Sequence, residues 1–292
     1  MSVRKLGGSL TIGRMLEQVT PFDPYKFFPH STQADWAPHL HWLKPDAMDP
    51  ATGELLFPMQ SYVVRTAHHT ILIDACIGNN KHRPTRPRWH LKNDGFWMQA
   101  TASHGVRPED IDFVMCTHLH PDHVGWNTRL DNGRWVPTFP NARYVFSRVE
   151  ADAWEKGIEG FARDAYEDSV LPVIAAGRAD LVEVDHAIDD EVWLEPSPGH
   201  TPGHVSVRLA SGGADAVMSG DLMHSPVQCA HPEWRPWPDW DSDLAARTRR
   251  AFLERYCDTA TLVCTAHFPL PSAGRVVAHG DAFRFVPDDQ DW

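Results

Sequence analysis

The sequence of 292 residues contains no run of about 20 apolar residues, which is the length that a membrane-spanning helix requires. Its first ten residues, MSVRKLGGSL, also lack the apolar segment of a secretory signal, so we expect a cytoplasmic protein that does not bind membranes. Neither a low-complexity linker nor an evident internal repeat divides the chain. Residues 1–292 are therefore expected to form a single domain with a large core.

Positive charge is scarce, since 27 lysines and arginines face 39 aspartates and glutamates and the net charge is -12. Binding to nucleic acid is excluded on this basis, because affinity for phosphates requires clustered basic residues. A single basic stretch stands out, and its interleaved prolines indicate an extended loop. This stretch, called the basic loop below, contains Lys81, Arg83, Arg86, Arg88 and Lys92. It is either a solvated or interface loop or a segment that attracts anionic substrates.

Cysteine is also rare, and no two cysteines have the CxxC spacing. The five cysteines are Cys76, Cys116, Cys229, Cys257 and Cys264. An odd number without paired spacing argues against a disulfide framework, and three of the five lie in apolar runs typical of strands. We expect reduced thiols in the core.

Short apolar runs that are typical of β-strands recur along the chain. They cover residues 61–65, 70–74, 111–117, 143–147, 181–184, 192–194, 205–209, 216–218 and 261–265. Helical patterns separate some of these runs, at residues 149–156, 160–176 and 243–256. The mixture predicts a layered α/β architecture. Residues 22–58 and 226–240, rich in proline and aromatic residues, are expected to be ordered loops of the kind that often shape a pocket.

The strongest signal is the segment THLHPDHVG, residues 117–125, which offers four candidate metal ligands within six residues. His118 and His120 are expected to face the same side of an extended segment, because the side chains of a strand alternate. Asp122 and His123 follow in a turn, where the backbone can present a second pair of ligands. The spacing therefore implies two metal ions.

Three further candidate ligands follow predicted strands: His200 in PGHTPG, Asp221 in SGD and His267 in TAH. Loops at one edge of a sheet converge, so a single site can gather all seven residues. Imidazole and carboxylate ligands without thiolate are typical of a catalytic zinc site that keeps a position open for water. Other histidines lack such a pattern and are interpreted as ordinary residues, namely His30, His39, His41, His68, His69 and His104.

These motifs resemble those of the metallo-β-lactamase superfamily. The resemblance runs from the strand ending at Asp74, through HxHxDH and GHTPGH, to the segment AHFP at 266–269, in the order expected for that family. It implies an α/β fold of the αβ/βα sandwich type, with two mixed sheets and helices on the outer faces. It also implies a site for two zinc ions, or for other divalent transition metals such as iron or manganese.

The resemblance assigns roles to individual residues. One zinc is held by His118, His120 and His200, the other by Asp122, His123 and His267, and the two are bridged by Asp221. His204 is interpreted as a structural residue at the start of the next strand. Asp74 either orients the ligand loop as a hydrogen-bond acceptor or forms a turn at the strand end. Asp122, which would touch both metal and water, is the expected proton shuttle.

Within the superfamily, the chain is similar to the branch that includes N-acyl-homoserine lactonases and methyl parathion hydrolases. It departs from the lactonases at His224, where they carry a tyrosine three residues after the bridging aspartate. His224 is either a catalytic residue that polarises the substrate or a residue that packs beside the site. The implied reaction is attack by a metal-bound hydroxide on a lactone, as in quorum quenching, or on an apolar ester.

Four alternatives stay open: an organophosphate hydrolase, a glyoxalase II-like thioesterase, a β-lactamase and a non-enzymatic binding protein. The sequence shows no obvious glutathione-recognition pattern and no export signal, and it retains all seven ligands. The expected partner is a small apolar ester or lactone, and a homodimer is left open. Residues that either line an apolar pocket or pack in the core are Trp126, Met223, Trp234, Trp237 and Trp240.

Overall fold

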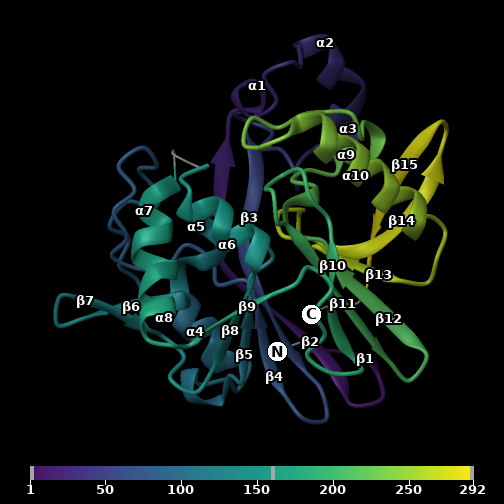
Figure 1. Cartoon of the computed structure of the whole chain (residues 1–292). Helices are drawn as coiled ribbons and strands as arrows, with labels where there is room; N and C mark the ends of the chain where they lie inside the picture. The colour runs from purple at the N-terminus through teal and green to yellow at the C-terminus, as the bar shows by residue number, and fades with distance from the viewer. Residues whose placement is uncertain (1–2, 159–161, 290–292) are drawn as a thin grey trace.

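The computed structural model describes residues 3–158 and 162–289 and contains two β-sheets packed face to face (Figure 1). In spatial order, the first sheet contains β1 (Arg4–Gly7), β2 (Leu10–Phe22), β3 (Leu55–Arg65), β4 (Thr70–Ile73), β5 (Phe113–Met115), β8 (Arg143–Ser147) and β9 (Ala179–Val182). The second sheet contains β10 (Val192–Pro196), β11 (Val205–Ser211), β12 (Ala214–Met218), β13 (Leu262–Cys264), β14 (Ala273–His279) and β15 (Ala282–Pro287). A separate hairpin is formed by β6 (Thr128–Asp131) and β7 (Arg134–Pro137).

Helices cover the outer faces of both sheets (Figure 1). Those packed on the first sheet are α4 (Phe96–Ser103), α5 (Pro121–Val124), α6 (Arg148–Glu155), α7 (Arg163–Ala165), the π-helical turn η5 (Tyr166–Val170) and α8 (Leu171–Ala175). On the second sheet lies α10 (Ser242–Tyr256), preceded by η6 (Gly220–Leu222) and α9 (Val227–Ala230). Short helical segments elsewhere are α1 (Pro24–Phe27), α2 (Gln33–Trp36), η1 (Ala37–His39), α3 (Leu40–Leu43), η2 (Pro108–Asp110) and η3 (Gly125–Asn127).

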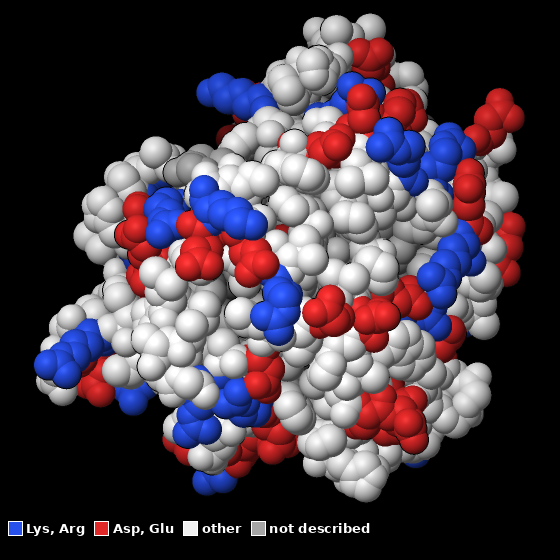
Figure 2. All heavy atoms as spheres, viewed as in Figure 1, with Lys and Arg blue, Asp and Glu red and all other residues white. Residues whose placement is uncertain are grey.

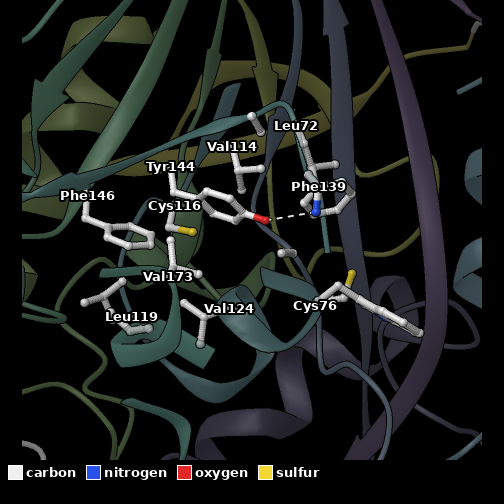
Figure 3. Close-up of a cluster of buried hydrophobic side chains, with 14 of the residues drawn as sticks. Leu72, Cys76, Val114, Cys116, Leu119, Val124, Phe139, Tyr144, Phe146 and Val173 are labelled. Atoms are coloured by element: carbon white, nitrogen blue, oxygen red, sulfur yellow. Dashed lines mark hydrogen bonds between the residues drawn. The ribbon is translucent and has the colours of Figure 1, made fainter. Parts of the chain in front are cut away.

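Side-chain alternation along the strands explains why both faces of the first sheet are buried. In β8, Tyr144 and Phe146 pack against the outer helices, whereas Val145 packs between the sheets. Figure 3 shows the outer cluster, where the hydroxyl of Tyr144 accepts a hydrogen bond from the amide of Phe139 at 3.0 Å. The second sheet contributes residues such as Val207 and Leu209 to the core between the sheets. The expected αβ/βα sandwich is confirmed.

The nine predicted strand runs all overlap observed strands, but four further strands of the two sheets were not predicted. These are β1, β2, β14 and β15. The segment 22–58, expected to be loop, contains α1, α2 and α3 as well as the start of β3. The predicted helix 160–176 corresponds to α7, η5 and α8, although residues 160 and 161 lie outside the described part of the chain.

Strand directions bring several loops to one edge of the sandwich. Strands β4 and β5 are parallel, as are β12 and β13, and β10 has the direction of β12 because β11 is antiparallel to both. Within each sheet, the loops that follow these strands therefore leave from the same edge. The loop after β5 leads into α5 (Figure 1), and residues from the loops of both sheets come together there. At the two ends of the described chain, Arg4 forms an ion pair with Asp288.

Surface charge is mixed, and Figure 2 shows Lys and Arg interspersed with Asp and Glu over the face in view. Within the residues that the structure describes, no helix is both long and apolar enough to span a membrane. All five cysteines are free; Cys257 is partly exposed and the other four are buried, as expected for core thiols.

Candidate metal centre

The seven predicted ligands come together at the edge where the loops converge. They form two groups, and within each group the potential ligand atoms lie within 4.8 Å of one another. The first group is His118, His120, His200 and Asp221, and the second is Asp122, His123 and His267. The six ligands that the family resemblance assigns to one metal or the other fall into these two groups accordingly, and Asp221 belongs to the first group.

The carboxylate of Asp221 lies between the two groups. Its Oδ2 atom is 3.7 Å from Nε2 of His118 and 3.4 Å from Nε2 of His200. Its Oδ1 atom faces the other group, at 3.1 Å from Nε2 of His123 and 3.0 Å from Nε2 of His267. One carboxylate thus presents an oxygen to each group, which is the arrangement that a bridging ligand requires.

The strand argument for His118 and His120 was wrong. Strand β5 ends at Met115, and both histidines lie in the irregular loop that follows it. The strand stops because the amide of Thr117 donates to the side chain of Asp74, at 2.8 Å, instead of continuing the β ladder. Helix α5 then begins after His120 and places Asp122 and His123 in its first turn.

Hydrogen bonds made by the ring nitrogen Nδ1, which does not face the metal position, hold two of the ligand rings in place. The side chain of Asp74 accepts a hydrogen bond from Nδ1 of His123 at 2.8 Å and so orients this ring. The backbone of Asp74 also has a turn conformation, with φ at 58°, so both of its expected roles are seen. The Pro58 carbonyl accepts from Nδ1 of His267 at 2.9 Å. Such contacts fix which ring nitrogen faces the metal position, here Nε2 in both histidines.

His204 positions the bridging carboxylate without joining either group. Its Nε2 atom accepts a hydrogen bond from the backbone amide of Asp221 at 3.0 Å, and its Nδ1 atom contacts the hydroxyl of Ser197 at 2.8 Å. Burial lowers the pKa of His204 to about 3, which keeps Nε2 a neutral acceptor. The interpretation of His204 as a structural residue agrees with this geometry.

Glu150 of α6 joins the two histidine loops. Its buried carboxylate accepts from the amide of Leu119 at 3.2 Å and from the amide of Gly203 at 2.9 Å, and also from Nε1 of Trp154 at 2.8 Å. A Cβ atom at Gly203 would lie 2.3 Å from the backbone nitrogen of Glu150, so only glycine allows this close approach. Sequence reasoning missed Glu150, because the two loops that it joins are 31 and 53 residues away in the chain.

We expect Glu150→Gln to weaken metal binding by about 10- to 100-fold and to lower the free energy of unfolding by about 1–3 kcal/mol. The amide nitrogen of glutamine would face one of the three N–H donors and leave it without an acceptor. Competition titration with a chelator and denaturant unfolding measure the two effects. Glu155→Gln, an exposed change on the same helix, is the matched control. Unchanged metal affinity in Glu150→Gln would show that the hydrogen bonds of Glu150 do not support the metal site.

A second pair of residues supports the site from the side of α10. Asp239 accepts from Nδ1 of His200 at 2.9 Å and lies 3.4 Å from Arg249. The buried guanidinium of Arg249 also donates to the carbonyl oxygens of Leu222 and Trp234, each at 2.8 Å. Arg249 therefore ties the loop of Asp221 to the loop that orients His200, a role for which the sequence offered no signal beyond a charged residue on the apolar face of a helix.

The electrostatics of the cluster suit a cation. Burial lowers the pKa values of His118 and His200 well below the ordinary value, which leaves neutral imidazoles with a free lone pair. Burial acts in the same direction on His123, but the carboxylates of Asp221, Asp74 and Asp122 together outweigh it and raise the pKa of His123 well above its ordinary value. Burial would raise the pKa of Asp221, but the surrounding histidines hold it well below its usual range. The ionised carboxylate of Asp221 therefore attracts positive charge to the position where the histidine nitrogens of the two groups converge.

Buried polar atoms without hydrogen bonds provide a test of whether a metal fits. Nε2 of His118, Nε2 of His123 and Oδ1 of Asp221 are buried and make no hydrogen bond within the described chain. Leaving such atoms unsatisfied costs about 1–3 kcal/mol each. All three belong to the two groups and are the atoms that would face a metal, so the donor set fits divalent cations.

The cavity beside the two groups has mostly apolar walls. Four of its aromatic residues are Phe22, Phe27, Phe57 and Trp237, which come from the two segments expected to shape a pocket. Of the other candidates, Trp126 is a core residue stacked on Trp97, and Met223, Trp234 and Trp240 are absent from the residues that line this cavity. The apolar pocket is present, but most of its residues were not those predicted.

His224 lines the same cavity and is almost fully buried. Its Nε2 atom lies 3.1 Å from Oδ2 of Asp221, and its ring stacks on that of His267 with centroids 5.6 Å apart. The backbone amide of His224 donates to Oε1 of Gln228 at 2.7 Å. His224 therefore contacts the site, although it is not a member of either ligand group.

The basic loop serves mainly as an internal support rather than as a solvated surface. Arg83 pairs with Asp168 through two hydrogen bonds of 2.8 and 2.9 Å. Lys81, fully buried, donates to Oγ1 of Thr128 at 2.7 Å, and Lys92 pairs with Glu17 at 2.7 Å. These three charges are neutralised or buried inside the molecule and are therefore not available to attract anionic substrates.

Comparison with known proteins identifies the family. Residues 56–267 match the model of the metallo-beta-lactamase superfamily. An N-acyl homoserine lactonase from a Bacillus species is 27% identical over 236 residues, which cover 74% of this chain and 83% of the relative.

Two solved structures share the fold. AidC, a dizinc quorum-quenching lactonase with a bound product, has a TM-score of 0.82 at 22% identity, over 99% of this chain and 98% of its own. The hydrolase AbOPH has a TM-score of 0.83 at 23% identity, over 99% of this chain and 97% of its own. Because the family match spans most of the sequence, the chain belongs to the metallo-beta-lactamase superfamily and is a metal-dependent hydrolase.

Proposed function

We propose that the protein is a dinuclear zinc hydrolase that opens lactones or cleaves apolar esters, and that residues 1–292 form its single domain. The observation that carries the proposal is the position of Asp221, whose two oxygens face separate groups of ligand atoms beside an apolar cavity. The lactonases among its relatives support the lactone as substrate.

The proposed metal ligands are those of the two groups. His118, His120 and His200 would hold one ion, Asp122, His123 and His267 the other, and Asp221 would bridge them. Two divalent cations at such a site act as Lewis acids and lower the pKa of water toward about 7, so that a nucleophile exists at neutral pH.

The remaining steps belong to side chains of the cavity. The apolar walls exclude water from the substrate and strengthen the electrostatic interactions at the reacting centre. Asp122 lines the cavity and is the proposed proton shuttle between the attacking water and the leaving oxygen. His224 lines the cavity beside Asp221 and is the second proposed catalytic residue, which would donate a hydrogen bond to a substrate oxygen.

Metal analysis combined with a substrate panel tests this function. We expect about two divalent metals per chain, loss of hydrolysis on chelation, and recovery when zinc is returned. On the panel, kcat/KM for lactones and aryl esters should exceed that for penicillins and acyl-glutathione thioesters by at least about tenfold, or about 1.4 kcal/mol of transition-state binding.

Each contrary result identifies a different error. Folded, active protein without metal would reject the metal mechanism. A preference of about a hundredfold for thioesters, about 2.7 kcal/mol, would favour a glyoxalase II-like enzyme, and preferential turnover of a phosphotriester would favour an organophosphate hydrolase. Metal without turnover of any substrate would favour a binding protein.

A further inference from the structure

Arg86 is the residue of the basic loop that faces the substrate cavity. Among the described residues that line this cavity, it is the one charged side chain other than the seven candidate ligands and His224. Arg86 and Asp122 line the same cavity, and burial lowers the pKa of Arg86 by more than the Asp122 carboxylate raises it. Lys81 and Arg83 of the same loop pair with Asp168 and are not among the residues that line this cavity.

A second cavity adjoins the first and shares three wall residues with it, Phe22, Arg86 and Trp89. Its remaining walls come from the end of β2 and from the basic loop, including Arg88. No aspartate or glutamate is among the described residues that line it. A substrate whose reacting carbonyl lies at the metal centre would therefore extend past Arg86 into a space that the described residues line with two arginines and with no carboxylate.

The position of Arg86 is fixed by its surroundings. Its guanidinium carbon lies 4.9 Å from the ring centroid of Trp89, and Nε1 of Trp89 donates to Oγ1 of Thr20 at 3.1 Å. The carbonyl of Arg86 accepts from the amides of Trp89 and His90 at 2.9 and 3.0 Å. A guanidinium held in this way loses little conformational freedom when it binds a planar anion, and the low dielectric of a partly buried site strengthens the pair.

We propose that Arg86 is a specificity-determining residue that binds a carboxylate at the distal end of the substrate's acyl chain, within the second cavity. The proposal rests on the proposed hydrolase function and adds to it a substrate class, an ester or lactone whose acyl chain ends in an anion. Phe22 and Trp89 would contact the methylene groups between the reacting carbonyl and that carboxylate.

Two matched pairs of p-nitrophenyl esters test this proposal: the hexanoate against the mono-ester of adipic acid, and the octanoate against the mono-ester of suberic acid. Within a pair, only the end of the acyl chain differs. We expect kcat/KM of the wild type to favour the anionic ester by at least about tenfold at one of the two lengths, mainly through KM, because the distal contact acts in both ground and transition states. In Arg86→Met, which keeps the length of the side chain, this ratio should fall to one or below.

The controls separate a local contact from general charge effects. Arg129→Met removes the same charge from the exposed β6–β7 hairpin and should leave the ratio unchanged, whereas Arg86→Lys should retain part of it. Sodium chloride should weaken turnover of the anionic ester more than that of the neutral ester in the wild type, a measurement that does not depend on folding of any variant.

Three outcomes would overturn the inference. Hydrolysis of both esters with a ratio near one, or with the same ratio in Arg86→Met as in the wild type, would reject the carboxylate site while leaving the hydrolase function intact. Equal losses for both esters in Arg86→Met, together with loss of metal, would show that Arg86 only supports Asp122. No hydrolysis of either ester by metal-loaded wild type would reject the proposed function itself.

Discussion

Asp221→Ala is expected to release at least one of the two metals and to reduce kcat/KM at least about a thousandfold, which is about 4 kcal/mol of transition-state stabilisation. The reason is the position of this carboxylate, with Oδ2 near His118 and His200 and Oδ1 near His123 and His267. Removing it takes away the one anion placed between the two groups, so cations brought together there would repel each other.

Metal content and kcat/KM should be measured on the same preparations of this variant. Asp221→Asn keeps the shape and removes the charge, so it should retain more structure but still lose metal affinity. Asp281→Asn, an exposed change in the turn between β14 and β15, controls for the altered net charge. If Asp221→Ala keeps two metals and more than about a tenth of the activity, another residue bridges the ions and the proposed centre is wrong.

His224→Ala should behave differently, with both metals retained and kcat/KM reduced about 10- to 1000-fold. That range is typical of losing one hydrogen-bond donor or general acid. Nε2 of His224 contacts Asp221 at 3.1 Å and the ring lines the cavity, but the residue stands outside both ligand groups. Loss of a metal in this variant would mean that His224 is itself a ligand.

His224→Phe distinguishes chemistry from packing. The ring centroid of His224 lies 5.6 Å from that of His267 and 5.0 Å from that of Phe27. Phenylalanine at this position can keep both ring contacts, but it cannot donate a hydrogen bond. We expect activity as low as in His224→Ala. Full activity in His224→Phe would assign the residue to packing, which is the alternative that the sequence left open.

The ligands could be predicted from the sequence because their chemistry is concentrated in short motifs. THLHPDHVG and PGHTPG carry the histidines at fixed spacing, and Asp221 and His267 each follow an apolar strand. The path of the backbone was less predictable: His118 and His120 lie beyond the strand, because Asp74 ends the β ladder at Thr117. The local pattern of apolar residues around Thr117 contains no information about Asp74, which lies 43 residues earlier and accepts the hydrogen bond of the Thr117 amide.

The supporting residues escaped prediction for the same reason. Glu150 and Arg249 are charged residues on helices, which ordinarily face solvent, and only the packed structure shows that each is buried and joined to two loops. Strand β2 was missed because its core-facing residues include Glu17, whose carboxylate accepts from the amide of Ile77 and the indole of Trp126. A buried carboxylate breaks the apolar alternation by which a strand is recognised.

The division of the ligands between the two sheets has a consequence for unfolding. Each group takes residues from loops of both sheets: His118 and His120 with His200 and Asp221 in one, and Asp122 and His123 with His267 in the other. Bound metals would act as cross-links between halves of a chain whose five cysteines form no disulfide. Resistance to heat would then follow the supply of free metal, with each site adding about 2.7 kcal/mol when free metal exceeds its dissociation constant a hundredfold.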